Sequence, residues 1–121
     1  MGVQAKRVYD PAAPTDGRRY LIDRLWPRGL RRDALQLTSW LKELAPSREL
    51  REWYAHDPGR YPEFRRRYRC ELQRQDELLS RLVNEALAGQ VTLLYAARDA
   101  EHCNAGVLQE LLEERYRKLV S

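Results

Sequence analysis

Residues 91–97 read VTLLYAA, an almost continuous apolar run that is typical of a strand buried on both faces. Residues 20–25 (YLIDRL) predict an earlier strand, which ends at a Trp-Pro-Arg-Gly sequence that cannot continue a central strand. Between these two strands, residues 62–88 have apolar side chains at helical spacing. Because a helical segment of this length is a natural crossover, the two strands are predicted to be parallel.

The flanking segments extend this pattern to a complete domain. Residues 4–9 predict a first strand, and the short loop after it leaves its orientation open. The apolar pattern lapses at residues 73–76, which predicts a break in the long helix, and Gly89 marks its end. Apolar spacing and capping residues predict three more helices: residues 38–45, residues 48–54 after the N-cap Ser47, and residues 99–119 with Asp99 as N-cap.

The prediction is therefore one α/β domain over residues 1–121, with a small open, mostly parallel sheet of about three or four strands flanked by helices. A chain of 121 residues can bury its own core, and no apolar run approaches the length of a membrane span. The first residues show no secretory signal, so the sequence favours a cytoplasmic protein without a membrane partner.

Cofactor and metal sites leave recognisable spacings, and none of them occurs here. The chain has neither a dinucleotide-binding glycine fingerprint nor a Walker loop. The two cysteines, Cys70 and Cys103, are predicted to be free thiols, and with His56 and His102 they form no metal-binding spacing. We therefore expect no metal and no cofactor.

The carboxyl ends of the strands are the predicted location of a functional site, because ligands bind at that edge of open parallel sheets. Arginines near these ends have guanidinium groups suited to a phosphate or carboxylate. Asp99 and His102, three residues apart, are the predicted catalytic pair, with Asp99 orienting the imidazole for proton transfer. The predicted ligand-binding residues are Asp23, Arg24, Arg28, Gly29, Tyr95 and Arg98.

Each of these residues also has a structural interpretation. Arg24 and Arg28 are equally suited to ion pairs with acidic neighbours such as Asp99, and Asp99 is well suited to a plain helix cap. His102 suits a solvated position as well as an acid–base role. Cys103 lies where a helix dipole would favour a reactive thiolate, but a small residue packed under the sheet is the favoured interpretation.

A second candidate surface is the basic run at residues 65–69 (RRRYR). It predicts nucleic-acid binding through Arg65, Arg66 and Arg69. A helix spreads these side chains around its axis, and the net charge of +4 is mild, so a solvated helix face is favoured. Nucleic acid stays an alternative partner.

Several strings in the chain resemble the YeaO-like family, bacterial proteins classed as domain of unknown function 488. The strings cover nearly the whole chain in matching order: KRVYD (6–10), DG (16–17), LIDRLWPRGL (21–30), LKELAPS (41–47), LREWYAHDP (50–58) and VTLLYAARDAEH (91–102). The resemblance implies a related fold and a cytoplasmic bacterial origin, but no reaction. A longer branch of the same superfamily has Cys-His-Arg after its third strand. Here Cys103 is followed by Asn104 and Ala105, which argues against a thiol mechanism.

Two hypotheses for function follow. In the first, the protein is an enzyme or binding domain for a small anionic ligand at the carboxyl ends of the strands. In the second, it is a nucleic-acid-binding or regulatory protein-interaction module without catalysis. The sequence leaves open whether the protein is an enzyme, and it does not indicate the substrate, the pathway or the oligomeric state.

Overall fold

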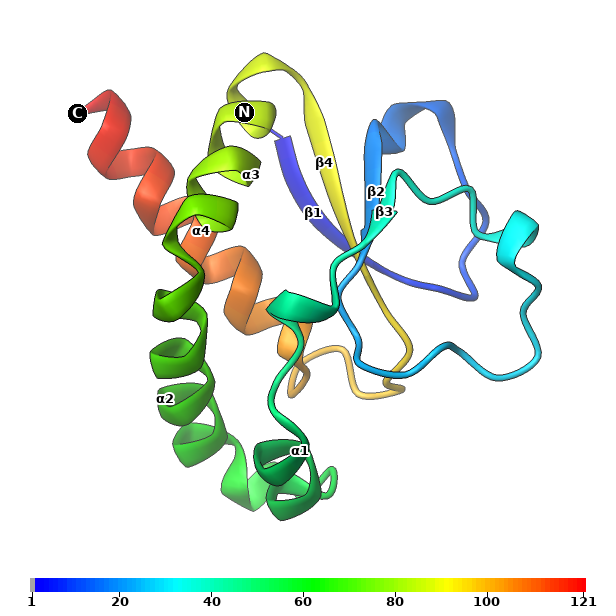
Figure 1. Cartoon of the computed structure of the whole chain (residues 1–121), viewed down its shortest axis with the longest axis vertical. Coiled ribbons are helices and arrows are strands. Elements are labelled where there is room, and N and C mark those ends of the chain that lie inside the picture. Colours follow the sequence, from blue (N-terminus) through cyan, green and yellow to red (C-terminus); the bar gives the residue numbers. More distant parts are fainter. Residues whose placement is uncertain (1) are drawn as a thin grey trace.

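The computed structural model describes residues 2–121 and shows a four-stranded sheet beside a layer of helices (Figure 1). The strands are β1 (Gly2–Arg7), β2 (Arg18–Leu21), β3 (Ser39–Trp40) and β4 (Gln90–Tyr95). Their order in the sheet is β1-β4-β2-β3, and every neighbouring pair is parallel. The predicted α/β fold and the parallel pairing of the second and last strands are confirmed, and the first strand is parallel as well.

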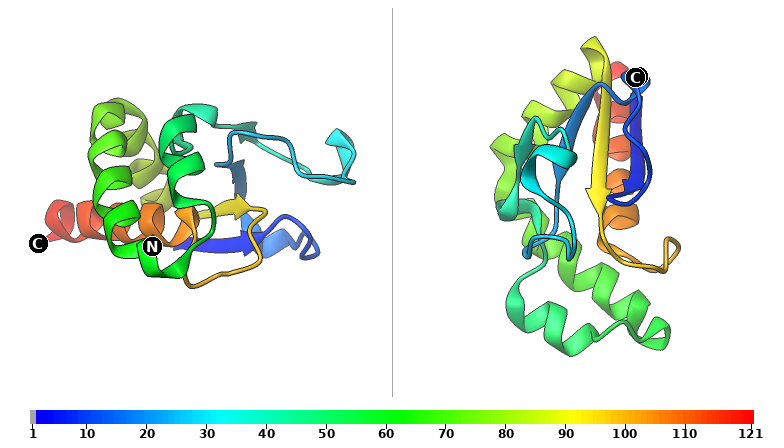
Figure 2. Two further views of the ribbon diagram at one scale, coloured as in Figure 1. Left: turned by 90° about the horizontal axis from the view of Figure 1, so that it is seen from below. Right: turned by 90° about the vertical axis from the view of Figure 1, so that its right-hand side faces the viewer.

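The two faces of the sheet are covered in different ways. The helices are α1 (Arg48–Tyr54), α2 (Tyr61–Leu72), α3 (Asp76–Ala88) and α4 (Asn104–Val120). Figure 2 shows them on one side of the sheet, with the long loop between β2 and β3 on the other. Among residues 2–121, no helix combines the length and the apolar character needed to cross a bilayer.

The core follows the alternation of side chains along β4, the inner strand between β1 and β2. Leu93 packs into the large cluster under the helices, together with Tyr20 from β2. Leu94 points to the opposite face, where it packs with Leu21 and Val8 beneath the loop. Both faces of β4 are buried, as the apolar run predicts.

The predicted ends of the middle helices are confirmed. The Ser47 hydroxyl accepts the Leu50 amide (3.2 Å) and caps α1. A 3-10 turn at Gln73–Gln75 separates α2 from α3, where the apolar pattern lapses. Gly89 follows the last residue of α3, in an extended conformation.

The helix predicted at residues 38–45 is wrong. The segment forms the short strand β3 and then a 3-10 turn at Lys42–Leu44. Its apolar residues divide between the two faces of the sheet: Trp40 packs under the loop, while Leu41 packs under the helices. This alternation belongs to a strand, and the Leu41 amide accordingly donates to the Leu21 carbonyl of β2 (2.8 Å).

The last helix begins at Asn104, with Cys103 as its N-cap residue, so the prediction that Asp99 starts the helix is also wrong. Residues 96–103 form a loop, and the Asp99 carboxylate accepts the Glu101 amide within it (3.1 Å). Such a local contact to the backbone competes with helix formation. The strands before this edge end at Leu21 and Tyr95, earlier than the predicted residues 25 and 97.

A buried carboxylate organises the opposite, amino end of the sheet. Asp16 is 1 % exposed and lies in an ion-pair network with Lys6 (3.0 Å) and the buried Arg19. Its carboxylate also accepts the Gln4 amide group (3.2 Å), and its carbonyl accepts the Thr92 hydroxyl (2.7 Å). The sequence indicates only a turn at this position.

Candidate functional site

Asp23 is the centre of the hydrogen-bond network at the carboxyl edge of the sheet. One oxygen of its carboxylate accepts the Ala96 amide just after β4 (2.9 Å), and the other accepts the side-chain amide of Asn104 at the start of α4 (2.9 Å). The Asn104 side chain also donates to the Ile22 carbonyl (3.1 Å). The Asp23 carbonyl accepts the Trp40 indole N–H (2.7 Å). Asp23 therefore connects four parts of the chain: the end of β2, the end of β4, the start of α4, and β3.

The electrostatics of Asp23 follow from its enclosure. Burial raises the pKa of the Asp23 carboxyl above its ordinary value. The hydrogen bonds from Asn104 and Ala96, and the positive field of His56 and Arg51, offset this rise in part. The network stabilises a carboxylate that would otherwise be costly to enclose.

The predicted pair of Asp99 and His102 is in contact. His102 Nδ1 lies 2.8 Å from the Asp99 carboxylate, on the loop before α4. This hydrogen bond lowers the pKa of Asp99. The imidazole also meets Tyr61 edge-on, at 5.2 Å between ring centroids, and the Tyr54 hydroxyl donates to the His102 carbonyl (2.6 Å). Asp99 and Tyr61 thus orient the ring, and Tyr54 holds the His102 backbone, at the rim of the carboxyl edge.

The Cys103 thiol lies inside the molecule. The residue is 3 % exposed, and burial raises its pKa even though the amides of Ala105 and Gly106 act to lower it. Its sulfur is 3.6 Å from the Ala100 carbonyl oxygen. A buried thiol with a raised pKa is a poor nucleophile, so the geometry agrees with the packing interpretation.

The predicted ligand-binding arginines do not converge on one point. The Arg24 Nε donates to the Pro46 carbonyl (3.2 Å). Arg28 is exposed on the loop side, where its carbonyl accepts the Tyr9 hydroxyl (3.0 Å). Arg98 is exposed just beyond β4. No ion pair joins any of the three arginines to an acidic residue within residues 2–121, so the structural alternative of ion pairs is not observed either.

Two other predicted residues have positions that limit their roles. Tyr95 is 5 % exposed and packs in the core under the helices, so its ring does not line the rim. Gly29 has a φ of +79°, which favours glycine, but a Cβ there would meet nothing within 4 Å. Gly29 is therefore a turn residue of the loop.

The sequence interpretation missed Asn104 and Arg7. Asn104 is nine-tenths buried and supplies the side chain that closes the network around Asp23. Arg7, at the end of β1, donates to the carbonyls of Ala97 (3.1 Å) and Ala96 (3.3 Å). In the sequence, Arg7 could have been noticed as an arginine at a strand end, and Asn104 as an asparagine at a helix start.

The basic run of α2 is neutralised by acidic neighbours. Arg65 forms a two-pronged pair with Glu110 of α4, and Arg69 pairs with Glu114 (2.6 Å). Arg66 pairs with Glu63 (2.8 Å) on its own helix. These charges are therefore engaged within the helical layer.

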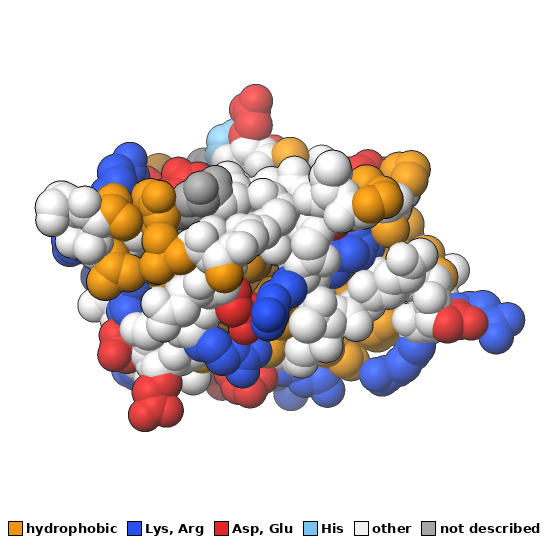
Figure 3. Space-filling view, turned by 90° about the horizontal axis from the view of Figure 1, so that it is seen from above, with side chains coloured by type: hydrophobic (Ala, Val, Ile, Leu, Met, Phe, Trp, Pro, Cys, Tyr) orange, Lys and Arg blue, Asp and Glu red, His pale blue; other side chains and the backbone are white. Residues whose placement is uncertain are grey.

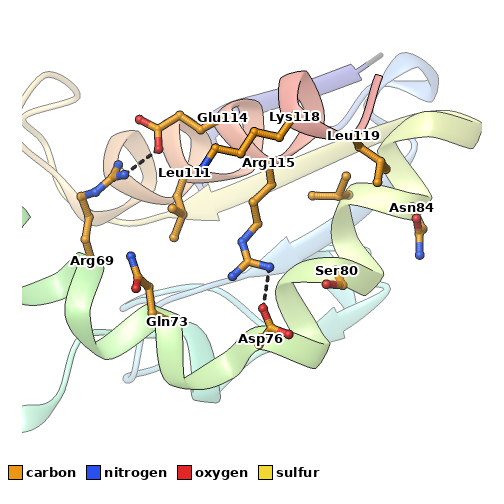
Figure 4. A pocket seen from close by; sticks show the side chains of 11 residues that line it. Arg69, Gln73, Asp76, Ser80, Asn84, Leu111, Glu114, Arg115, Lys118 and Leu119 are labelled. Carbon is orange, nitrogen blue, oxygen red and sulfur yellow. Dashed lines mark hydrogen bonds and ion pairs between the residues drawn. The ribbon is translucent and has the colours of Figure 1, made fainter. Parts of the chain in front are cut away.

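A hollow among the helices lies away from the strand ends. A groove of about 730 Å³ runs between α4 and the α2–α3 pair, and Figure 4 shows the side chains along it. Two ion pairs bridge its walls: Arg115 with Asp76 (2.8 Å), and Arg69 with Glu114. None of the predicted site residues lines this groove.

Comparison with known proteins now identifies the family. A family model described as "Inactive DUF488-N3 subclade" matches residues 2–120. The chain is 43% identical over 112 residues to the uncharacterized protein YeaO of Escherichia coli (strain K12), covering 93% of this chain and 97% of that one. It is 43% identical over 115 residues to the uncharacterized protein Rv3073c of Mycobacterium tuberculosis (strain H37Rv), covering 93% and 95%. No solved structure matches the chain. The chain therefore belongs to the DUF488 family, within the subclade whose model carries the description inactive.

Proposed function

We propose that this protein is a non-catalytic binding domain that holds a small anionic ligand at the carboxyl edge of its sheet. The observation that carries the proposal is the closed network around Asp23. Both carboxylate oxygens already accept hydrogen bonds, from the Ala96 amide and from Asn104. A general base must offer its lone pair to the substrate, so a carboxylate engaged in this way serves structure better than proton transfer.

The exposed groups at this edge define the ligand's chemistry. The Arg98 side chain is exposed and has no acidic partner within residues 2–121. His102 lies four residues further along the same loop and is about one-third exposed at its side chain (36%). A guanidinium and an imidazole on one loop are groups that suit a phosphate or a carboxylate. Asp99 follows Arg98 in the loop, and its carboxylate is 2.8 Å from His102 Nδ1 and orients the ring.

A catalytic function is the second candidate, and one contact favours it. The 2.8 Å contact between His102 Nδ1 and the Asp99 carboxylate orients His102 as acid–base groups are oriented in many enzymes. A partner nucleophile is the missing part, because the nearby Cys103 thiol is buried. The description of the family model as inactive agrees with the non-catalytic proposal.

Thermal-shift titrations test the proposal. Phosphate, sulfate, nucleotides and small carboxylates are added to the parent protein and to Arg98→Gln, His102→Gln and the control Arg74→Gln, an exposed arginine after α2. At a hundredfold excess over its dissociation constant, a ligand stabilises the folded state by about 2.7 kcal/mol. We expect a rise in melting temperature that Arg98→Gln and His102→Gln reduce and Arg74→Gln retains.

The same mixtures separate binding from catalysis. After overnight incubation, ³¹P and ¹H NMR spectra of the ligands should be unchanged. Turnover that His102→Gln abolishes would establish the catalytic candidate instead. If no anion raises the melting temperature of the parent protein or of its variants, both candidate functions at this edge are overturned.

A further inference from the structure

The positive charge of the protein is concentrated in one loop. The chain has 22 Lys and Arg residues and 18 Asp and Glu residues. Residues 24–32 (RLWPRGLRR), here called the arginine loop, hold four of the arginines and no acidic residue, so the rest of the chain has 18 charges of each sign. The net charge of +4 therefore equals the charge of the arginine loop.

Three of these arginines extend into solvent. Arg28, Arg31 and Arg32 are exposed, whereas the half-buried Arg24 is held by the Pro46 carbonyl. Arg31 Nε lies 3.5 Å from the Asp33 carboxylate. Both side chains are more than three-quarters exposed (86% and 76%), so this ion pair is weak. In the view from above, Lys and Arg side chains border the right-hand end of the molecule, where the loop lies (Figure 3). The arginines of α2, in contrast, pair with glutamates.

Two indoles, Trp26 of the arginine loop and Trp40 of β3, pack together against the Arg32 side chain. Trp26 and Trp40 meet at 65° with 5.4 Å between ring centroids. The Arg32 guanidinium lies over both rings, 4.9 Å from Trp26 and 5.3 Å from Trp40, and the Lys42 ammonium lies 4.0 Å from Trp40. In the turn after β1, Tyr9 is 45% exposed and donates its hydroxyl to the Arg28 carbonyl.

We propose that the arginine loop binds single-stranded nucleic acid. Guanidinium forks bind phosphate oxygens, and aromatic or guanidinium planes stack on unpaired bases. The loop supplies Arg28 and Arg31 for phosphates and the stacked Arg32 for bases, and Tyr9, which contacts the loop at the Arg28 carbonyl, adds an exposed ring. Its one regular element is a 3-10 turn at Arg32–Ala34, which is too short to enter the major groove of a duplex as a recognition helix does. The inference uses a surface other than the proposed ligand site at Arg98 and His102.

A lipid surface fits the arginine loop less well. Membrane-binding loops insert aromatic and aliphatic side chains among the headgroups. Here the Trp26 indole N–H is donated to the Leu30 carbonyl (2.7 Å) and that of Trp40 to the Asp23 carbonyl (2.7 Å). Both indoles are thereby anchored in the protein. Within residues 24–32, Leu25 is the large apolar side chain that is mostly exposed (59%).

The test is fluorescence anisotropy with labelled single-stranded DNA and RNA of about 15 nucleotides, titrated with the parent protein at two salt concentrations. The loop variant combines Arg28→Gln, Arg31→Gln and Arg32→Gln. The matched control combines Arg74→Gln, Arg117→Gln and Lys118→Gln, three exposed residues outside the loop that remove the same charge. Circular dichroism melting verifies that all the proteins are folded.

We expect the loop variant to lose at least about tenfold in affinity and the control less than about threefold. The slope of log affinity against log salt should fall by about 1.4 in the loop variant, since it loses the two phosphate contacts of Arg28 and Arg31 and each contact on a single strand contributes about 0.7. Arg32→Lys, which keeps the charge but not the planar fork, should weaken binding on its own. Equal losses in loop variant and control, no binding at low salt, or binding that depends on Arg98 and His102 instead would each overturn the proposal. So would binding to phosphatidylserine vesicles but not to the oligonucleotides.

Discussion

Asp16 connects β1, β2 and β4 through contacts to Lys6, Arg19 and Thr92. Burial acts to raise the pKa of its carboxyl, but the hydrogen bonds from Lys6, the Ala13 amide and Arg19 outweigh burial and lower that pKa. The residue was visible in the sequence only as part of an Asp-Gly turn. Its role depends on partners up to 76 positions away, which no local pattern indicates.

Asp16→Asn should lower the free energy of unfolding by about 3 kcal/mol at neutral pH, because it leaves the buried Arg19 without its counterion. The folded pKa of Asp16 is lower than the unfolded one, so the unfolded chain binds the proton first as the pH falls. The contribution of the Asp16 carboxylate to the free energy of unfolding is therefore present at neutral pH and is lost as the pH falls below about 4. Urea denaturation at pH 7 and pH 3.5 measures the difference.

Asp33→Asn is the control for this prediction, because the Asp33 side chain is 76% exposed and its ion pair is weak. It should change stability by less than about 0.5 kcal/mol. An Asp16→Asn penalty of the same size at both pH values would show that its charge is not what stabilises the fold.

At the carboxyl edge, the sequence predicted one contact and missed another. The three-residue spacing of Asp99 and His102 indicated their contact, although the pair lies on a loop and not on a helix. The contact of Asp23 with Asn104 spans 81 positions and depends on where α4 starts. Local spacing could not reveal it, because the helix was predicted to begin five residues too early.

At the scale of elements, α1 depends on the side chain just before it. The Ser47 hydroxyl accepts the Leu50 amide and donates to the Glu71 carboxylate of α2 (2.6 Å), and the Ser47 amide donates to the same carboxylate (2.8 Å). One serine therefore caps α1 and attaches it to α2. The capping role could be predicted from the sequence, but the attachment could not.

Ser47→Ala should cost about 1 to 2 kcal/mol, the upper part of the range for a lost N-cap, because the Glu71 contact is lost with it. Chemical denaturation monitored by circular dichroism measures the change. Ser80→Ala is the matched control, since Ser80 is exposed within α3 and alanine favours the helix. A loss in the control as large as that of Ser47→Ala would contradict the capping account.

The helix predicted at residues 38–45 failed for a reason that also belongs to this scale. Apolar residues at positions 37, 40, 41 and 44 fit helical spacing, yet Trp40 and Leu41 pack on opposite faces of the sheet. The spacing of apolar residues in so short a segment does not distinguish a helix from a strand. The backbone pairing with β2 determines the result.

At the scale of the whole molecule, stability should decrease from β4 outwards. β4 pairs on both sides and is buried on both faces, whereas β3 is a two-residue edge strand. Native-state hydrogen exchange measured by NMR should find the Leu93 and Leu94 amides among the slowest, exchanging only with global unfolding. The amides of residues 28–33, which lie in the exposed loop, should exchange fastest after the chain termini. Protection in this loop equal to that of β4 would contradict this gradient.

The sequence predicted parallel strands but not their order. The segment between β1 and β2 is short, and neighbouring strands are the simplest solution for such a connection. Instead, β4 lies between them, so residues 8–17 cross two strand spacings, about 10 Å, and also return along the sheet from the carboxyl end of β1 to the amino end of β2. Ten residues cover that distance easily, and only the packing of the complete chain determines which strand occupies the gap.

The position of β4 also has a consequence during synthesis on the ribosome. β1 finds its partner only when residues 90–95 have been made, after nearly three-quarters of the chain. At typical elongation rates, the interval is on the order of ten seconds. At the end of that time the nascent chain has α1, α2 and α3 but neither its central strand nor α4, and the apolar face of β2 stays without its full cover. Chaperones that recognise emerging polypeptides would therefore meet this protein before its sheet exists.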